Sequence, residues 1–151
     1  MFRILFLLFS VLIIQGCGVR SPIARFNGAM VTQSTPEAIA LTAQFEIANT
    51  NDEPLQLKFY NYTVTSGGRT VYRGMASAEQ SVPRWSAMQS SIPVVIRRED
   101  MQGDGDTVWH LSGTLSYIPP KAMAETLLNI GIWEPSIQIR AEGVVDLPRT
   151  N

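Results

Sequence analysis

The stretch Ile39–Phe59, which reads IALTAQFEIANTNDEPLQLKF, decides the fold of this chain. As far as Ile47 every second side chain is apolar and those between are mostly small or polar, and this period of two is typical of a β-strand with one buried face. The turn formers Asn49-Thr50-Asn51-Asp52 interrupt the pattern, and it restarts at Leu55. The stretch therefore predicts two consecutive strands joined by a polar turn.

Alternation of the same kind recurs along the rest of the chain. A weaker first strand is expected at Ile23–Val31. Thr70–Ala76 is expected to return from a hairpin at Ser66-Gly67-Gly68, because glycine supplies the positive φ of tight β-turns. Three further strands are marked by Ile92, Val94 and Ile96, by Trp109, Leu111, Leu115 and Tyr117, and by Ile137, Ile139, Ala141, Val145 and Leu147. About seven strands at this spacing predict an all-β antiparallel sandwich.

The strand pattern also predicts a core and three local features. The expected inward residues are Ile39, Leu41, Phe45, Ile47, Leu57, Ile92, Val94, Ile96, Trp109, Leu111, Leu115, Ile137 and Ile139. A change of parity in the run from Leu55 to Val64 predicts a β-bulge near Asn61. Pro93 lacks an N–H and is expected on an edge strand. The segment between Ala78 and Ala87 is expected to be a polar loop.

One segment departs from the strand pattern. Lys121–Ile130 is rich in Ala, Met, Glu and Leu, which favour helix. Pro120 suits the first helical turn and Gly131 suits the position just beyond the end. One short helix is therefore expected between the last two strands.

The amino terminus has the features of an export signal. Arg3 is followed by the apolar run Ile4–Ile14, which is too short to span a bilayer and suits a cleaved signal peptide. Ile14-Gln15-Gly16-Cys17 then resembles a lipobox, in which cleavage precedes a lipid-modified cysteine. We therefore expect a signal peptide at 1–16, a lipidated tether at 17–22 and a β-sandwich domain at 23–151.

Lipidation of Cys17 would hold the protein on a membrane. Each buried CH₂ contributes about 0.8 kcal/mol, so two or three acyl chains attach a protein lastingly where one does not. Cys17 is also the only cysteine, so a disulfide within the chain is excluded. In the lipoproteins that the lipobox resembles, Asp after the cysteine retains the protein in the inner membrane. Gly18 therefore implies an outer-membrane anchor with the domain facing the periplasm.

The motifs between Phe45 and Gly143 resemble those of a known family. They include Asn49-Thr50-Asn51 after an alternating strand, a glycine hairpin at Gly67-Gly68, Val82-Pro83, and single glycines in the last two strands, Gly113 and Gly143. In this order they are similar to the water-stress and hypersensitive-response (WHy) domain of the second late-embryogenesis-abundant group. The resemblance implies a fibronectin-type-III-like sandwich, a turn at Asn49 and Asn51 like that of the family, and no enzyme activity.

Composition and residue types disfavour catalysis and several kinds of partner. The net charge is −1 and basic residues are not clustered, so a nucleic-acid partner is not expected. His110 is the only histidine and lies at an outward position of its strand, so no catalytic residue is assigned. Glu99, Asp100, Asp104 and Asp106 do not match a Ca²⁺ loop, so neither a metal nor a cofactor is predicted.

The last open question concerns Leu127, Leu128, Ile132 and Trp133. These apolar residues, with Ile130, either cap the open end of the sandwich or bind a partner; capping is favoured, because such residues are usually buried. Two functions follow for a membrane-anchored, non-catalytic envelope lipoprotein. One is stress or desiccation protection in the late-embryogenesis-abundant manner. The alternative is an adaptor that binds an envelope protein through a sheet edge or the 121–133 segment.

Overall fold

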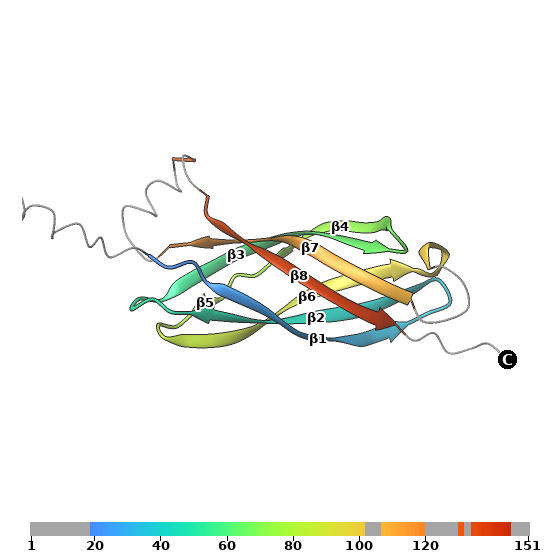
Figure 1. Cartoon of the computed structure of the whole chain (residues 1–151), viewed down its shortest axis with the longest axis horizontal. Helices are drawn as coiled ribbons and strands as arrows, with labels where there is room; N and C mark the ends of the chain where they lie inside the picture. The colour runs from blue at the N-terminus through green and yellow to red at the C-terminus, as the bar shows by residue number, and fades with distance from the viewer. Residues whose placement is uncertain (1–18, 102–106, 120–129, 132–133, 146–151) are drawn as a thin grey trace, which may run out of the picture.

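The computed structural model describes residues 19–101, 107–119, 130–131 and 134–145, and these form two antiparallel sheets packed face to face (Figure 1). The strands are β1 (Ile23–Ser34), β2 (Ala38–Asn49), β3 (Leu55–Ser66), β4 (Arg69–Ser77), β5 (Ser81–Val82), β6 (Ser86–Arg97), β7 (Thr107–Ile118) and β8 (Ser136–Val145). A 3₁₀ turn, η2 (Arg98–Asp100), follows β6. No helix within the described ranges has the length and apolar character needed to cross a membrane.

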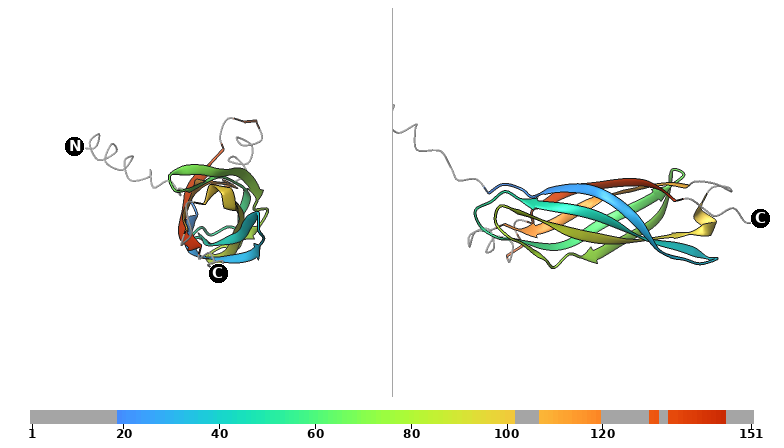
Figure 2. Two further views of the ribbon diagram at one scale, coloured as in Figure 1. Left: turned by 90° about the vertical axis from the view of Figure 1, so that its right-hand side faces the viewer. Right: turned by 90° about the horizontal axis from the view of Figure 1, so that it is seen from below.

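The strand order confirms the fibronectin-type-III-like sandwich. One sheet has the order β1-β2-β6 and the other β4-β3-β7-β8, with the short β5 also paired to β3. The view along the long axis shows the two sheets enclosing one core (Figure 2). β4 and β5 both pair antiparallel with β3, so these two consecutive strands run in the same direction along one edge of the second sheet.

The core consists of the inward residues of both sheets. Twelve of the thirteen residues expected to face inward are buried, and Ile137 is half-buried against them. Phe26, which β1 contributes, packs against Phe45 and stands edge-on to Trp109 with ring centroids 6.2 Å apart. The two-residue hairpin is also confirmed, since Gly67 and Gly68 both have positive φ, 55° and 77°.

The bulge lies earlier than the sequence predicts. The pairing of β3 with β7 shifts between Leu57 and Tyr60, and Tyr60, Tyr62 and Val64 are buried beyond the shift. Lys58 and Phe59 therefore lie opposite Ser116 alone, and the bulge is formed there instead of near Asn61. Phe59 has an apolar side chain and continues the alternation of Leu55 and Leu57. For this reason the sequence pattern places the bulge after Phe59.

The expected polar loop between Ala78 and Ala87 is partly wrong. Val82 is fully buried and pairs with Leu55 as part of β5, while Ala78 is also buried. A two-residue strand has too few residues to show alternation. The expected helix at Lys121–Ile130 lies almost entirely outside the described residues.

Tyr62 closes the seam between the two sheets. Its hydroxyl donates to the carbonyl oxygen of Pro93 in β6, and its ring lies 5.7 Å from that of Tyr72 in β4. β6 pairs with β2 alone, so it is an edge strand, as Pro93 predicts. Burial, followed by the charge of Tyr72 and the hydrogen bond with it, raises the pKa of Tyr62 far above its ordinary value.

We expect this raised pKa to make the domain less stable in alkali. Above about pH 10 the unfolded chain ionises at Tyr62 while the folded chain keeps it protonated, so the free energy of unfolding falls as the pH rises. The slope for one such group is about 1.4 kcal/mol per pH unit. Urea unfolding between pH 8 and 11 measures it, and Tyr62→Phe should give a shallower profile. Identical slopes in both proteins would contradict the assignment.

Candidate functional site at the amino-terminal end of the sandwich

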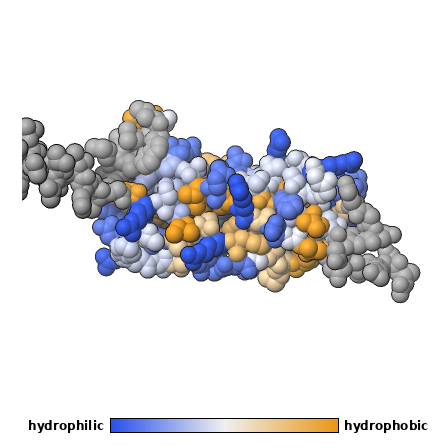
Figure 3. Space-filling view, viewed as in Figure 1, coloured by the Kyte–Doolittle hydropathy of each residue, from blue (hydrophilic) through white to orange (hydrophobic). Residues whose placement is uncertain are grey.

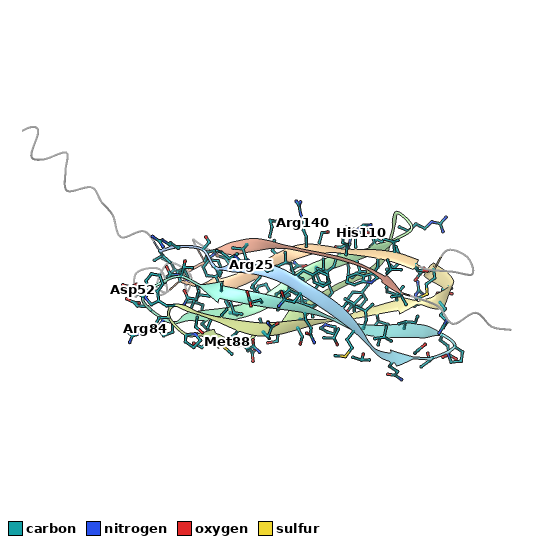
Figure 4. The ribbon with its side chains drawn as sticks, turned by 60° about the horizontal axis from the view of Figure 1, so that its bottom comes forward. Arg25, Asp52, Arg84, Met88, His110 and Arg140 are labelled. Carbon is teal, nitrogen blue, oxygen red and sulfur yellow. The ribbon has the colours of Figure 1, made fainter. Side chains whose placement is uncertain are left out.

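Three segments meet where the chain enters the domain. They are the residues before β1, the turn between β2 and β3, and the connection from β5 to β6. Figure 4 shows Asp52 and Arg84 together at this end of the sandwich. Two asparagines hold the segments together, and we call Asn49 and Asn51 the amide pair.

Asn49 binds backbone on both sides of the pair. Its side-chain oxygen accepts from the backbone N–H of Asn51 at 3.0 Å, the local bond typical of asparagine in turns. Its amide nitrogen donates to the carbonyl oxygens of Glu53 at 2.9 Å, Val82 at 3.1 Å and Pro83 at 3.2 Å. Asn49 is 1% exposed, so these bonds replace water that the side chain cannot reach.

Asn51 holds the incoming chain. Its side-chain oxygen accepts from the backbone N–H of Arg20, and its amide nitrogen donates to the carbonyl oxygen of Arg20, both at 2.8 Å. The same nitrogen lies 2.9 Å from the side-chain oxygen of Asn49, which joins the two asparagines. One side chain thus satisfies both backbone groups of Arg20, as a neighbouring strand would.

Two further contacts fix the residues that follow Arg20. The hydroxyl of Tyr117, at the end of β7, donates to Ser21 Oγ at 3.0 Å, and Pro22 is buried. The expected tether at 17–22 is therefore docked on the domain from Arg20 onward. Arg20 lies three residues after Cys17, so the chain enters the fold almost at the cysteine.

The backbone of Asn51 also positions an exposed tryptophan. Trp85 donates its backbone N–H to the carbonyl oxygen of Asn51 at 3.2 Å. It has φ 51°, which is uncommon for a bulky residue and costs of order 1–3 kcal/mol. Its side chain is 65% exposed, although the alternating pattern of the sequence gives no sign of an exposed tryptophan here. The preceding Pro83 and Arg84 are exposed as well.

The structure describes only part of the residues singled out in the sequence. Cys17, Leu127, Leu128, Ile132 and Trp133 lie outside the described residues, so lipidation and the choice between capping and partner binding stay predictions. Two neighbours are described. Ile130 is 60% exposed, and Gly131 has φ 72°, the left-handed conformation that suits glycine beyond a helix end.

The described polar residues considered for chemistry lie at the surface, with Asp100 partly covered. His110 Nδ1 lies 3.6 Å from Glu142 Oε2 on the outer face of β7 and β8, and both side chains are more than half exposed. Arg97 pairs with Glu99 at 2.6 Å and with Asp100 at 2.9 Å. Asp104 and Asp106 lie outside the described residues. Within the described part of the chain, no three His, Cys, Asp or Glu side chains gather as a metal site would require.

The fold, but not the sequence, is similar to known proteins. No protein-family model and no curated protein matches the chain. The solution structure of AT1g01470 from Arabidopsis thaliana is 16% identical with a TM-score of 0.65, covering 89% of this chain and 87% of that one. The solution structure of At2g46140.1, a late embryogenesis abundant (LEA) protein, is 16% identical with a TM-score of 0.66, covering 93% and 79%. A crystal structure of a protein from Archaeoglobus fulgidus is 14% identical with a TM-score of 0.50, covering 87% and 100%. At this identity the similarity concerns the fold.

Proposed function

We propose that this protein is a lipid-anchored, non-catalytic envelope lipoprotein whose sandwich protects membrane or protein surfaces under stress. The observation that carries the proposal is the pair of hydrogen bonds from the Asn51 side chain to the backbone of Arg20, three residues beyond Cys17. A domain that begins this close to an acylated residue stays beside the membrane that carries the lipid.

The fold supports the protective part of the proposal. The LEA protein with the same architecture aligns over 93% of this chain. The arrangement of the described polar residues agrees with a non-catalytic role, because His110 and Glu142 face solvent instead of a water-excluded pocket. Gly18 and the export signal support an outer-membrane anchor with the domain in the periplasm.

We expect the mature protein to begin with acylated Cys17. Mass spectrometry of the intact, membrane-extracted protein should give the mass of residues 17–151 plus two or three acyl chains. Cys17→Ser should abolish that mass and leave uncleaved or mislocalised protein, while Ser21→Ala should be processed normally. A mature amino terminus at any other residue would refute the anchor.

Protection can be measured apart from anchoring. An enzyme that loses activity on drying should keep more of it in the presence of the domain than with an equal mass of an unrelated β-sandwich. Equal losses would remove the stress-protective part and leave the anchor in place.

One observation favours the adaptor as the second candidate. A groove of about 640 Å³ runs beside the bulge in β3 and the edge strand β4. Phe59, Met75 and Ile118 line it, and Met75 is 69% exposed. Cross-linking from position 75 in intact cells should capture one recurrent partner if the protein is an adaptor.

A further inference from the structure

We propose that the amino-terminal end of the sandwich rests on the lipid surface itself, with the Trp85 side chain in the interfacial layer of the bilayer. This inference depends on the anchor proposed above and adds a second, non-covalent contact with the same membrane. The contact surface consists of Trp85 and Arg84, with Arg20 beside them, and we call it the membrane-facing tip.

The short distance that the chain can span between Cys17 and Arg20 is the first step of the argument. The backbone of Arg20 is fixed to Asn51, and Cys17 is three residues away. Three residues extend at most about 11 Å even when fully stretched. Headgroup and interfacial regions add about 5–7 Å on each side of a hydrocarbon core of about 30 Å. The acyl chains of Cys17 therefore keep Arg20 within about two headgroup layers of the hydrocarbon core.

The position of Trp85 carries the second step. Asn51 binds Arg20 through its side chain and the backbone N–H of Trp85 through its backbone oxygen. The same residue therefore holds both the incoming chain and the backbone of Trp85. Trp85 is 65% exposed, although tryptophan is usually covered in a soluble domain. Tryptophan is enriched at membrane–water interfaces, where its ring and its N–H are both accommodated.

The charges at this end decide which lipids are needed. Arg20 and Arg84 are exposed, and the β2–β3 turn adds exposed Asp52 and Glu53. The two positive charges of Arg20 and Arg84 are matched by the two negative charges of this turn, so these residues do not form a basic surface. The contact should therefore rest on the aromatic ring and form on zwitterionic as well as anionic bilayers, in contrast to a polybasic surface that needs anionic lipid.

The test uses the full acylated lipoprotein in vesicles. Acylated Cys17 has no free thiol, so Arg84→Cys can be labelled alone with a fluorophore while Trp85 remains. In phosphatidylcholine vesicles that contain brominated acyl chains, we expect strong quenching of the label at 84. A label at Val108→Cys serves as the control, because Val108 is exposed in β7 near the opposite end, where hydrophobic side chains also show on the surface (Figure 3).

Two comparisons make the result decisive. Adding Trp85→Ser to the labelled Arg84→Cys protein should remove the quenching, whereas adding phosphatidylglycerol should leave it unchanged. Failure of the protein to float with vesicles would count against the anchor. A floating protein whose label at 84 is quenched no more than that at 108 would overturn the membrane-facing tip alone. Protection of position 84 in native envelopes but not in vesicles would overturn it in favour of a protein partner.

Discussion

Gly113→Ala is expected to destabilise the domain by about 3 kcal/mol, at the upper end of the usual cost of overpacking. Gly113 in β7 pairs with Tyr62 in β3, and a Cβ on it would run into the backbone oxygen of Asn61. It would also lie 2.8 Å from the Cα and Cβ of Tyr62. These are backbone or near-backbone atoms, so no side-chain rotation relieves the overlap and the central strands of the sheet must separate.

Urea unfolding of the soluble domain measures this effect. With a denaturant slope of about 1–3 kcal/mol per M, the midpoint should fall by about 1–3 M. Ser112→Ala is the matched control, since its side chain is exposed one residue away in the same strand. It should shift the midpoint by no more than a surface substitution does, about 0.5 kcal/mol. A Gly113→Ala midpoint within the control's range would show that β3 and β7 separate easily.

Asn49→Ala is expected to cost about 2–4 kcal/mol, because a buried polar group that loses its partner costs about 1–3 kcal/mol. The substitution leaves the carbonyl of Val82 and the backbone N–H of Asn51 without the partners they have in the fold. Asn49→Asp should be at least as harmful, since a carboxylate keeps the acceptor but cannot donate to the surrounding carbonyl oxygens.

The same experiment can separate the two asparagines. Asn51→Ala should also destabilise the domain, and in addition it should free the chain before β1, which faster amide exchange at Arg20 would report. Asn49→Ala should have the smaller effect on Arg20. Thr50→Ala, between them, is the control for the turn. Equal stability of Thr50→Ala and Asn49→Ala would show that the amide pair contributes little to the fold.

The sequence predicts the sandwich because its strands are long and half-buried. Alternation over Ala38–Asn49 and over β7 is visible without knowledge of the partner strands, and the glycine pair of the hairpin specifies a turn locally. The bulge at Lys58 and Phe59 is predicted too late in the sequence, because Phe59 is apolar and continues the alternating pattern although it lies in the bulge. β5 was missed because its two residues show no period.

The amide pair could be assigned only a local role from the sequence. The bond from Asn49 to the N–H of Asn51 spans two residues and follows from the residue type, but the bonds to Val82 and Arg20 span 33 and 31 residues. The exposure of Trp85 could not be predicted from the sequence for a related reason. The backbone bond to Asn51 and the positive φ that turn it outward are properties of the assembled end, and an aromatic residue is more often buried.

Pro93 and Tyr62 have a consequence for copies of the protein that the proposed lipid anchor would hold in one plane. An open sheet edge invites pairing with another chain, and confinement to a plane brings identical edges together far more often than dilution in a volume does. On β6 the ring of Pro93 removes one donor, and the hydroxyl of Tyr62 occupies the carbonyl oxygen of the same residue. A neighbouring copy therefore finds neither the N–H nor the free carbonyl oxygen of residue 93 for pairing. This gap in the row of edge hydrogen-bonding groups hinders the assembly of β-sheet fibres.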